Sequence, residues 1–367
     1  MSTYHWKLRT VVAAVGMALM APIAMAGTSA ASANLSSSQS AVGSFDMTAH
    51  TANKAKVHGH VLQNASGNVG VNDAAGSNNL QGNNTDIAVM SGAGSATSSV
   101  INSQVAIASG TLSLRGHNHA SASGHVLQNA SGNIGMNVAA GEQNMQGNNL
   151  AIADAGANSS SEAVVVDEQV SNRAMMWFPS FAVDMAGHNH ASLSGHVLQN
   201  ASGNIGVNVG SGAQNMQANN TALALGSNGP AFAMTAASQM SGPWSFTGSF
   251  GSRNTASVTG HVLQNASGKI GANVAAGAQN MQSNDLAYAF SGGKTAGNAS
   301  AYTEVSQVSM GAIAANLPAG YCRLTPVTNT ATVSGHVMQN AAGDIGLNVA
   351  AGAGNLQRNT MTIAVGQ

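Results

Sequence analysis

The sequence predicts an all-β protein, namely a β-solenoid or cross-β stack of five imperfect repeats joined by less ordered connecting loops. Three observations predict this fold: a motif that recurs five times, a period-two alternation inside it, and a shortage of large core residues. Only 6% of the 367 residues are charged and 4% are aromatic, whereas Gly contributes 44 residues. This composition disfavours an ordinary globular enzyme, and its low charge also disfavours solvated disorder.

The N-terminal segment has the pattern of a secretory signal peptide. Lys7 and Arg9 precede an apolar run over residues 11–20, which leads to the small-residue pattern Ala24-Met25-Ala26. These features match the charged region, the hydrophobic region and the cleavage site of such a signal. We therefore expect residues 1–26 to be removed and the rest to be secreted. No later stretch has the length and apolarity of a transmembrane helix, so we do not expect the protein to span a membrane.

Five copies of one motif alternate with segments that vary. The second copy reads GHVLQNASGNIGMNVAAGEQNMQGNNLAIAD, and the five copies are identical at 14 of 31 columns. Six of those columns hold Asn or Gln, so the copies share amides rather than large hydrophobic residues. The predicted organisation after the signal peptide 1–26 is an N-terminal segment 27–58, repeats 59–89, 124–154, 195–225, 260–290 and 335–367 (the last including the C-terminus), and linkers 90–123, 155–194, 226–259 and 291–334.

Each copy has the local chemistry of β-strands. In the second copy Ile134, Met136 and Val138 alternate with small or polar residues, which is the period of a strand. Turn-forming residues at 131–133 and 140–141 suggest the order strand, turn, strand, turn, strand. The prolines that follow the signal peptide all lie outside the copies, which fits backbone paired along the whole repeat.

The variable segments carry a weaker pattern. Each contains one Gln-centred phrase, and aromatic residues such as Trp177 and Trp244 concentrate there. We expect these segments to form exposed or loosely packed connecting loops. The Gln residues of the five phrases are Gln39, Gln104, Gln169, Gln239 and Gln307.

Stacking of the copies would provide hydrogen-bond partners for the shared amides. One copy buries too little apolar surface to fold alone, so its partners must come from other copies. In-register stacking about 4.8 Å apart places identical side chains above one another, and an amide can then donate to its own image in the next layer. The predicted ladder columns are Gln63, Gln128, Gln199, Gln264 and Gln339; Asn72, Asn137, Asn208, Asn273 and Asn348; and Gln81, Gln146, Gln217, Gln282 and Gln357, the last within an Asn-x-Gln-x-Asn series.

Charge supports this register. No aligned column of the five copies holds two like charges, which would repel at the layer spacing. The single column with two charges pairs Lys269 with Asp344 in consecutive copies.

Histidine is the other candidate for a site. One invariant column contains His60 and its four equivalents, and the pairs His117 with His119 and His188 with His190 share a strand face at i, i+2. Such pairs can bind zinc or copper, but no Cys or carboxylate completes a recurrent ligand set. We therefore expect solvent-exposed imidazoles at strand ends rather than a metal site. Because a stacked column would gain charge below about pH 6.5, acid should weaken or slow assembly.

Other chemistries find no support in the sequence. The acids form no recurrent pair and the glycines lack a phosphate-loop context, so we predict no enzyme and no cofactor. The formal net charge of −1 predicts no nucleic-acid partner. Cys322 is the single cysteine and excludes an intramolecular disulfide.

The phrase Asn200 to Val209 (NASGNIGVNV), with Gln279-Asn280-Met281-Gln282 in the next copy, closely resembles the repeats of bacterial Fap functional-amyloid subunits. The phrase Asp167 to Ser171 (DEQVS) in a variable segment is also similar. The resemblance implies a subunit that passes through an outer-membrane secretion pore and polymerises with itself, alongside minor fibril subunits, into extracellular cross-β fibrils. This sequence departs from that family in two respects. Family members usually have fewer copies and a C-terminal Cys-x-x-Cys pair, whereas this chain has five copies and the single Cys322.

Two functions from different classes follow. The first is a structural subunit of extracellular functional-amyloid fibrils that supports a biofilm matrix and surface adhesion. The alternative is a monomeric β-solenoid adhesin that binds a surface, a carbohydrate or a metal through its loops. Seedable conversion to fibrils distinguishes the first from the second.

Overall fold

The computed structural model describes residues 30–42, 45–107, 110–173, 181–241, 246–292, 298–309, 313–317 and 327–366. The predicted signal peptide and Cys322 lie outside them. Within these residues the chain forms 25 β-strands, all paired in parallel. The predicted all-β stack of repeats is confirmed. The same residues contain no helix that could cross a membrane.

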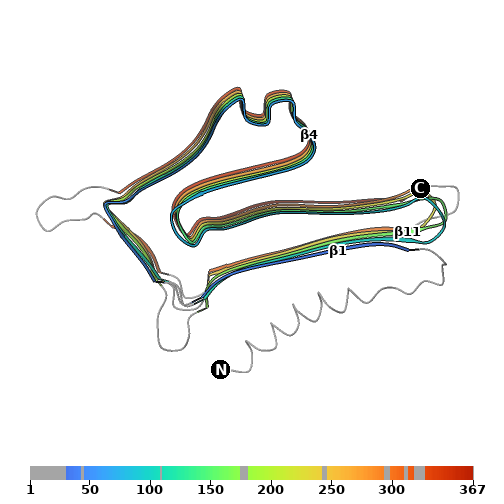
Figure 1. Cartoon of the computed structure of the whole chain (residues 1–367), viewed down its shortest axis with the longest axis horizontal. Helices are drawn as coiled ribbons and strands as arrows, with labels where there is room; N and C mark the ends of the chain where they lie inside the picture. The colour runs from blue at the N-terminus through green and yellow to red at the C-terminus, as the bar shows by residue number, and fades with distance from the viewer. Residues whose placement is uncertain are drawn as a thin grey trace, which may run out of the picture.

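The chain winds through five layers, and each layer contributes one strand to each of five sheets. The layers comprise β1–β5, β6–β10, β11–β15, β16–β20 and β21–β25. Figure 1 looks along the stack, where the layers superimpose as nearly identical folded traces. Equivalent residues in adjacent layers are 65 to 75 positions apart, as the Gln63 column illustrates.

The first sheet, called the β1 sheet, comes from the variable segments. Its strands place the Gln of each Gln-centred phrase in one column, because Gln39 pairs with Gln104 and every later layer keeps that register. The strands are β1 (Ala30–Val42), β6 (Ser95–Ile107), β11 (Ser160–Arg173), β16 (Ala231–Ser241) and β21 (Ala299–Ser309).

Two further sheets come from the remainder of the N-terminal and linker segments. The β2 sheet consists of β2 (Phe45–Ala49), β7 (Gly110–Leu114), β12 (Phe181–Met185), β17 (Phe246–Phe250) and β22 (Ile313–Leu317). The β3 sheet consists of β3 (Ala52–Gly59), β8 (His117–Gly124), β13 (His188–Gly195), β18 (Arg253–Gly260) and β23 (Thr328–Gly335). Along β8 the inward residues are Asn118, Ala120 and Ala122, and the residues between them face outward.

The repeats supply the last two sheets. The β4 sheet consists of β4 (Ser66–Ala75), β9 (Ser131–Glu142), β14 (Ser202–Ala213), β19 (Ser267–Ala278) and β24 (Ala342–Ala353). The β5 sheet consists of β5 (Leu80–Met90), β10 (Met145–Ala155), β15 (Met216–Gly226), β20 (Met281–Ser291) and β25 (Leu356–Gly366). In Figure 1 the β5 sheet runs between the β1 sheet and the β4 sheet.

Two apolar cores hold these sheets together. The larger lies between the β3 and β4 sheets, where Ile134, Met136 and Val138 pack with Leu127 and their equivalents. Their alternation with small residues is the pattern that predicted strands, and it now points the branched side chains at one core. The smaller core, between the β5 and β1 sheets, consists mainly of alanines and of Val100 and Val165. Alanine lets these two sheets approach closely.

A tight turn connects the β3 and β4 sheets in every layer. In the second layer Leu127 and Asn129 adopt φ values of 56° and 55°, in the left-handed region. Asn tolerates this conformation, whereas Leu does so at a cost that its burial in the larger core offsets. The turn repeats at the equivalent positions of all five layers.

The connecting segments are more regular than predicted. Instead of loose loops, the described parts of 90–123, 155–194, 226–259 and 291–334 form strands of the β1, β2 and β3 sheets. A layer is therefore a variable segment together with the repeat that follows it, not a repeat alone. These segments stack as strictly as the repeats, since backbone pairing between layers requires register rather than sequence identity.

The order of strands and turns inside a repeat also differs from the prediction. The predicted turns at 131–133 and 140–141 both lie within β9, while the chain reverses at 126–129 and bends at Gln143. Gly132 and Gly141 do adopt positive φ values of 107° and 110°, but they kink the strand without reversing it. Each repeat therefore consists of a turn, a kinked strand, a bend and a second strand.

Candidate functional site: amide ladders and an imidazole column

The Gln63 column forms a continuous chain of hydrogen bonds at the turn between the β3 and β4 sheets. In each layer Gln Nε2 donates to Gln Oε1 of the next layer, over 2.7 to 2.9 Å. The column runs through Gln63, Gln128, Gln199, Gln264 and Gln339. Side chains 65 to 75 residues apart in the sequence are thereby linked along the axis of the stack.

The Asn72 column lies deeper, between the β4 and β5 sheets. Here each Asn Nδ2 donates back to Asn Oδ1 of the preceding layer, over 2.9 to 3.0 Å. Asn208 also donates to the carbonyl of Gly147 and to Asn148 Oδ1, both at 3.1 Å. The ladder therefore ties layers together and two sheets together at once. Its members are Asn72, Asn137, Asn208, Asn273 and Asn348.

The Gln81 column is the third predicted ladder and lies on the β5 sheet. Its Nε2 atoms donate to the next layer over 2.7 to 2.9 Å, through Gln81, Gln146, Gln217, Gln282 and Gln357. Gln146 Nε2 also donates to the carbonyl of Val138 at 3.1 Å. The three middle residues of this column are fully buried, so their amides depend on these partners entirely.

Five more columns form ladders through all five layers. Three belong to the invariant amides of the repeats and begin at Asn64, Asn79 and Asn83. The other two, which begin at Gln39 and Asn53, come from the variable segments. The Gln-centred phrases marked the Gln39 column. An Asn six residues before each repeat could have marked the Asn53 column.

Glycine makes room for the ladder between the β4 and β5 sheets. A Cβ on Gly206 would overlap Asn148 Oδ1, and one on Gly135 would overlap Asn83 Oδ1. The equivalent glycines, Gly271 and Gly346, face Asn219 and Asn284 in the same way. Invariant Gly and invariant Asn are therefore two halves of one packing arrangement.

The invariant histidines form a stack of parallel rings beside the Gln63 column. Ring centroids of successive imidazoles are 4.7 to 4.9 Å apart along His60, His125, His196, His261 and His336. In the second layer His125 Nδ1 lies 2.8 Å from Gln128 Oε1. Because that oxygen can only accept, Nδ1 carries the proton and Nε2 is left to face outward.

The four histidines considered for metal binding lie on the outer face of the β3 sheet. His117 stacks on His188 at 4.9 Å, and His119 lies 4.7 Å from His190. Burial lowers the pKa of His119 and of His190, and the nearby Lys56 lowers both pKa values further. Within the described residues, no three His, Cys, Asp or Glu side chains come together as a metal site would require.

Charged side chains also enter the interior. Lys269 Nζ lies 3.5 Å from Asp344 Oδ2, in the column where the sequence aligned the two charges. Burial lowers the pKa of Lys269, and Asp344 opposes that effect. Asp167 and Asp285 are also buried, and burial raises the pKa of both carboxyls.

The two end layers differ from the middle layers in exposure. Among the described residues, seven of the eight exposed large apolar side chains belong to the first or the fifth layer. In the Gln81 column, the first and last residues are half-buried while the three between them are buried. Within the described residues, each middle layer has a layer on both sides, whereas each end layer has one on a single side. The seven side chains are Met47, Ile87, Val89, Tyr302, Val333, Leu356 and Met361.

Comparison with known proteins places the sequence in a family. The model of the functional amyloid protein FapB/FapC family matches residues 16–153, 102–247 and 232–367. The functional amyloid subunit FapC of Pseudomonas aeruginosa is 33% identical over 271 residues, which cover 68% of this chain and 77% of that protein. No solved structure matches the chain. Since the three matched segments together cover most of the sequence, the chain belongs to the functional amyloid protein FapB/FapC family.

Proposed function

We propose that the chain is a secreted structural subunit that stacks on copies of itself to form extracellular functional-amyloid fibrils. In this role the fibrils scaffold a biofilm matrix and attach it to surfaces. Export through an outer-membrane pore and cooperation with minor fibril subunits are part of the same proposal. A relative named as a functional amyloid subunit supports it.

The observation that carries the proposal is the state of the two ends. All five sheets end in edge strands, β1–β5 at one end and β21–β25 at the other, and within the described residues no strand pairs with their outer edges. Exposed edges and apolar side chains on the same layers favour addition of another parallel strand at every sheet. The fifth layer of one copy and the first layer of the next offer the same columns.

The eight amide ladders are proposed to continue across that junction. In a fibril Asn348 of one copy would then lie against Asn72 of the next, as Asn208 lies against Asn137 within the chain. Each added copy would gain one amide hydrogen bond per ladder, worth about 1 kcal/mol net each when buried, besides five backbone ladders.

Seeded assembly of residues 27–367 tests the proposal. Fibrils should form after a lag that preformed fragments shorten, and their fibre diffraction should show the interstrand spacing of about 4.8 Å along the axis. In fibrils mixed from differently labelled copies, solid-state NMR should detect contact between Asn348 of one copy and Asn72 of another. The contact between Asn137 and Asn208, which lies within one chain, serves as the control. A folded chain that stays monomeric would contradict the proposal and favour the adhesin alternative.

A further inference from the structure

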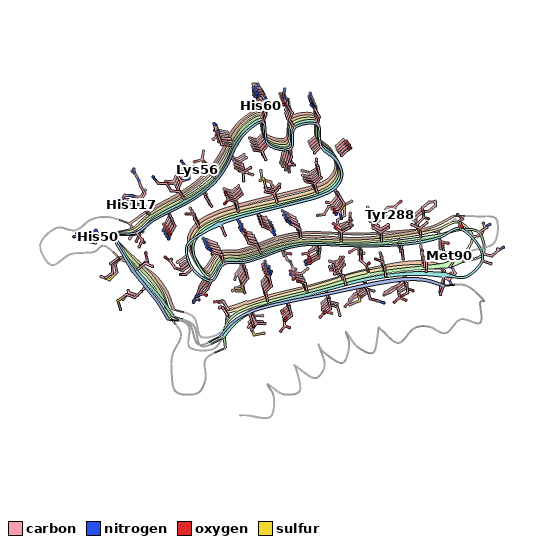
Figure 2. All side chains as sticks on the ribbon, in the orientation of Figure 1. His50, Lys56, His60, Met90, His117 and Tyr288 are labelled. Atoms are coloured by element: carbon pink, nitrogen blue, oxygen red, sulfur yellow. The ribbon has the colours of Figure 1, made fainter. Side chains whose placement is uncertain are left out.

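The fold gathers eleven of the twelve histidines of a nearly neutral chain, and four of its eleven lysines and arginines, on one surface. Every histidine except His5 lies on the outer face of the β3 sheet or at its two margins, the corner with the β2 sheet and the turn toward the β4 sheet. Lys54, Lys56, Arg115 and Arg253 lie there as well, all exposed. We call this surface the basic face. Figure 2 shows His50, His117, Lys56 and His60 along this edge of the layer.

The basic face has no opposing charge. Segments 50–64, 115–129, 186–200, 251–265 and 327–340, which form it, contain no Asp and no Glu. Glu142 approaches the sheet from the interior, where it is buried and accepts a hydrogen bond from Thr48 Oγ1 at 3.1 Å. Although the net charge of the chain is only −1, the permanent charges on this surface are therefore all positive.

The layers repeat this surface along the axis. His117 and His188 stack in one outward column and continue as Arg253, while Lys54 is followed by His119 and His190 in the next. At the corner, His50, Arg115, His117 and His188 line a shallow hollow with Ala186. A long anionic chain can contact several layers at once, which a small anion cannot.

We propose that the basic face binds an anionic polysaccharide that carries carboxylates, and that it holds this polymer along the stack. Charge complementarity selects a polyanion. Hydroxyls lie beside the basic columns, where the His58 column continues as the half-buried Ser123, Ser194 and Thr259, and these suit the hydroxyl groups of sugars. The imidazole Nε2 atoms of the His60 column face outward beside them, to accept from a hydroxyl when neutral and to donate to a carboxylate when protonated.

Two other polyanionic partners fit the basic face less well. The five segments contain no Phe, Tyr or Trp, so no aromatic ring is available for stacking on nucleic-acid bases. Their outward positions also lack large apolar side chains, since Val333, which is half-exposed in the last layer, continues the inward column of Val258; insertion into a lipid surface therefore has no anchor. Nucleic acid and anionic membranes are therefore the comparisons in the test.

Protonation should strengthen the interaction. Burial lowers the pKa of His119, His188 and His190, and their basic neighbours, Lys56, His117 and Arg253 among them, add to the effect. At neutral pH the face thus relies on its four permanent charges. Below pH 6, uronic carboxylates remain ionised while the imidazoles become positive, and attraction grows.

The test uses sodium polygalacturonate as the probe and residues 27–367 as the protein, assembled or monomeric. Cosedimentation or fluorescence anisotropy at about 0.15 M ionic strength should show binding that tightens at least about tenfold, or about 1.4 kcal/mol, between pH 7.5 and pH 5.5. The variant K54Q/K56Q/R115Q/R253Q should lose at least about tenfold in affinity at neutral pH. A matched variant, S32E/N34D/S36E/S40E, lowers the net charge by the same amount on the outer face of β1 and should bind as the wild type does.

Several outcomes would overturn the proposal. Equal affinity of the quadruple basic-face variant and the wild type, with both folded by circular dichroism, would do so. So would equal loss in the matched variant, since net charge alone would then explain binding. Affinity for duplex DNA or for phosphatidylserine vesicles equal to that for polygalacturonate, at matched charge, would also refute recognition of a polysaccharide. Imidazole NMR signals that stay unchanged on titration with polygalacturonate would contradict it independently of any variant.

This inference needs the stack of layers but not its growth into fibrils. A chain that binds polygalacturonate yet never fibrillises would contradict the proposed function and leave the basic face in place. Fibrils that do not bind polygalacturonate would support the proposed function and contradict the basic-face proposal.

Discussion

Asn102 Nδ2 donates to Asp167 Oδ1 at 2.7 Å across the interface between the second and third layers. The carboxyl is 1% exposed, and the fourth layer places Ala237 in its column, which offers no donor from that side. Burial raises the pKa of Asp167 to about 7, the hydrogen bond from Asn102 opposes that effect, and the nearby Asp285 adds to it. An interior acid of this kind makes the stability of the stack depend on pH.

We expect Asp167→Asn to stabilise the stack at neutral and alkaline pH. The folded pKa is raised above the unfolded value of about 3.9, so the contribution of the acid is fully present below pH 4 and is lost as pH rises through 7. At about 1.4 kcal/mol per pKa unit, the loss is on the order of 4 kcal/mol. The midpoint of denaturant-induced dissolution, measured from pH 4 to pH 8, should fall less in the variant than in the wild type, because one of the two buried acids with a raised pKa is then gone.

Asp154→Asn provides the matched control, because Asp154 is exposed on the adjacent second layer. Its dissolution midpoint should follow that of the wild type at every pH. If Asp167→Asn also followed the wild type, the interior carboxyl would not carry the pH dependence.

The histidines of β8 and β13 should act in the opposite direction. Burial lowers the pKa of both His119 and His190, so the fold favours neutral imidazoles. The stability they contribute is present above the unfolded value of about 6.5 and is lost as pH falls through the lowered folded values. In a background that carries both Asp167→Asn and Asp285→Asn, which removes the two buried acids with a raised pKa, acidification from pH 7.5 to pH 5 should therefore lower the dissolution midpoint. Adding H119N/H190N should flatten that slope, and an unchanged slope would exclude these two groups as its source.

Asn208→Ala should destabilise the stack by removing the centre of a ladder. The Asn208 amide donates to Asn137 Oδ1, to Asn148 Oδ1 and to the carbonyl of Gly147, and its oxygen accepts from Asn273. Leaving such buried partners unpaired costs about 1 to 3 kcal/mol. Assembly should slow and the dissolution midpoint should fall. Asn34→Ala, at an exposed Asn bonded only to Ser32 Oγ, should change neither measurement.

Gly206→Ala should disrupt the same interface by sterics. The added Cβ would overlap Asn148 Oδ1, so the Asn83 column would have to move apart at that layer. Overpacking in a tight interior typically costs about 1 to 3 kcal/mol. Gly92→Ala is the control, because a Cβ there meets nothing within 4 Å. Hydrogen exchange should report faster opening of β14 and β15 in Gly206→Ala, while equal exchange in the two variants would contradict the packing argument.

The sequence predicted those parts of the fold in which identical residues of successive repeats also lie directly above one another in the stack. The six invariant amide columns of the repeats all appear as ladders, because a gapless alignment of stacked repeats is also a statement of register. The opposite charges of Lys269 and Asp344 met for the same reason. Asn64 combines two roles, since it adopts the left-handed conformation of the turn and also forms a ladder.

Other parts could not be predicted from the repeats. The β1 and β3 sheets arise from segments whose lengths differ between layers, so a single period does not align them, although Gln39 and Asn53 left a trace. The turn at Leu127 escaped prediction because Leu seldom adopts positive φ, and only burial between two sheets compensates it. The basic face depends on which face of each strand points outward. The overall composition and net charge do not contain that information.

The amide ladders also have a direction. In the Gln63 and Gln81 columns every Nε2 points toward the following layer, whereas in the Gln39 and Asn72 columns every amide nitrogen points back. Two copies meeting at like ends would set donor against donor in one column and acceptor against acceptor in another. Only head-to-tail contact satisfies both, and along a straight stack such an interface leaves both ends open for further addition. A filament of this chain would thus be polar, with two chemically distinct ends. These ends should elongate at unequal rates.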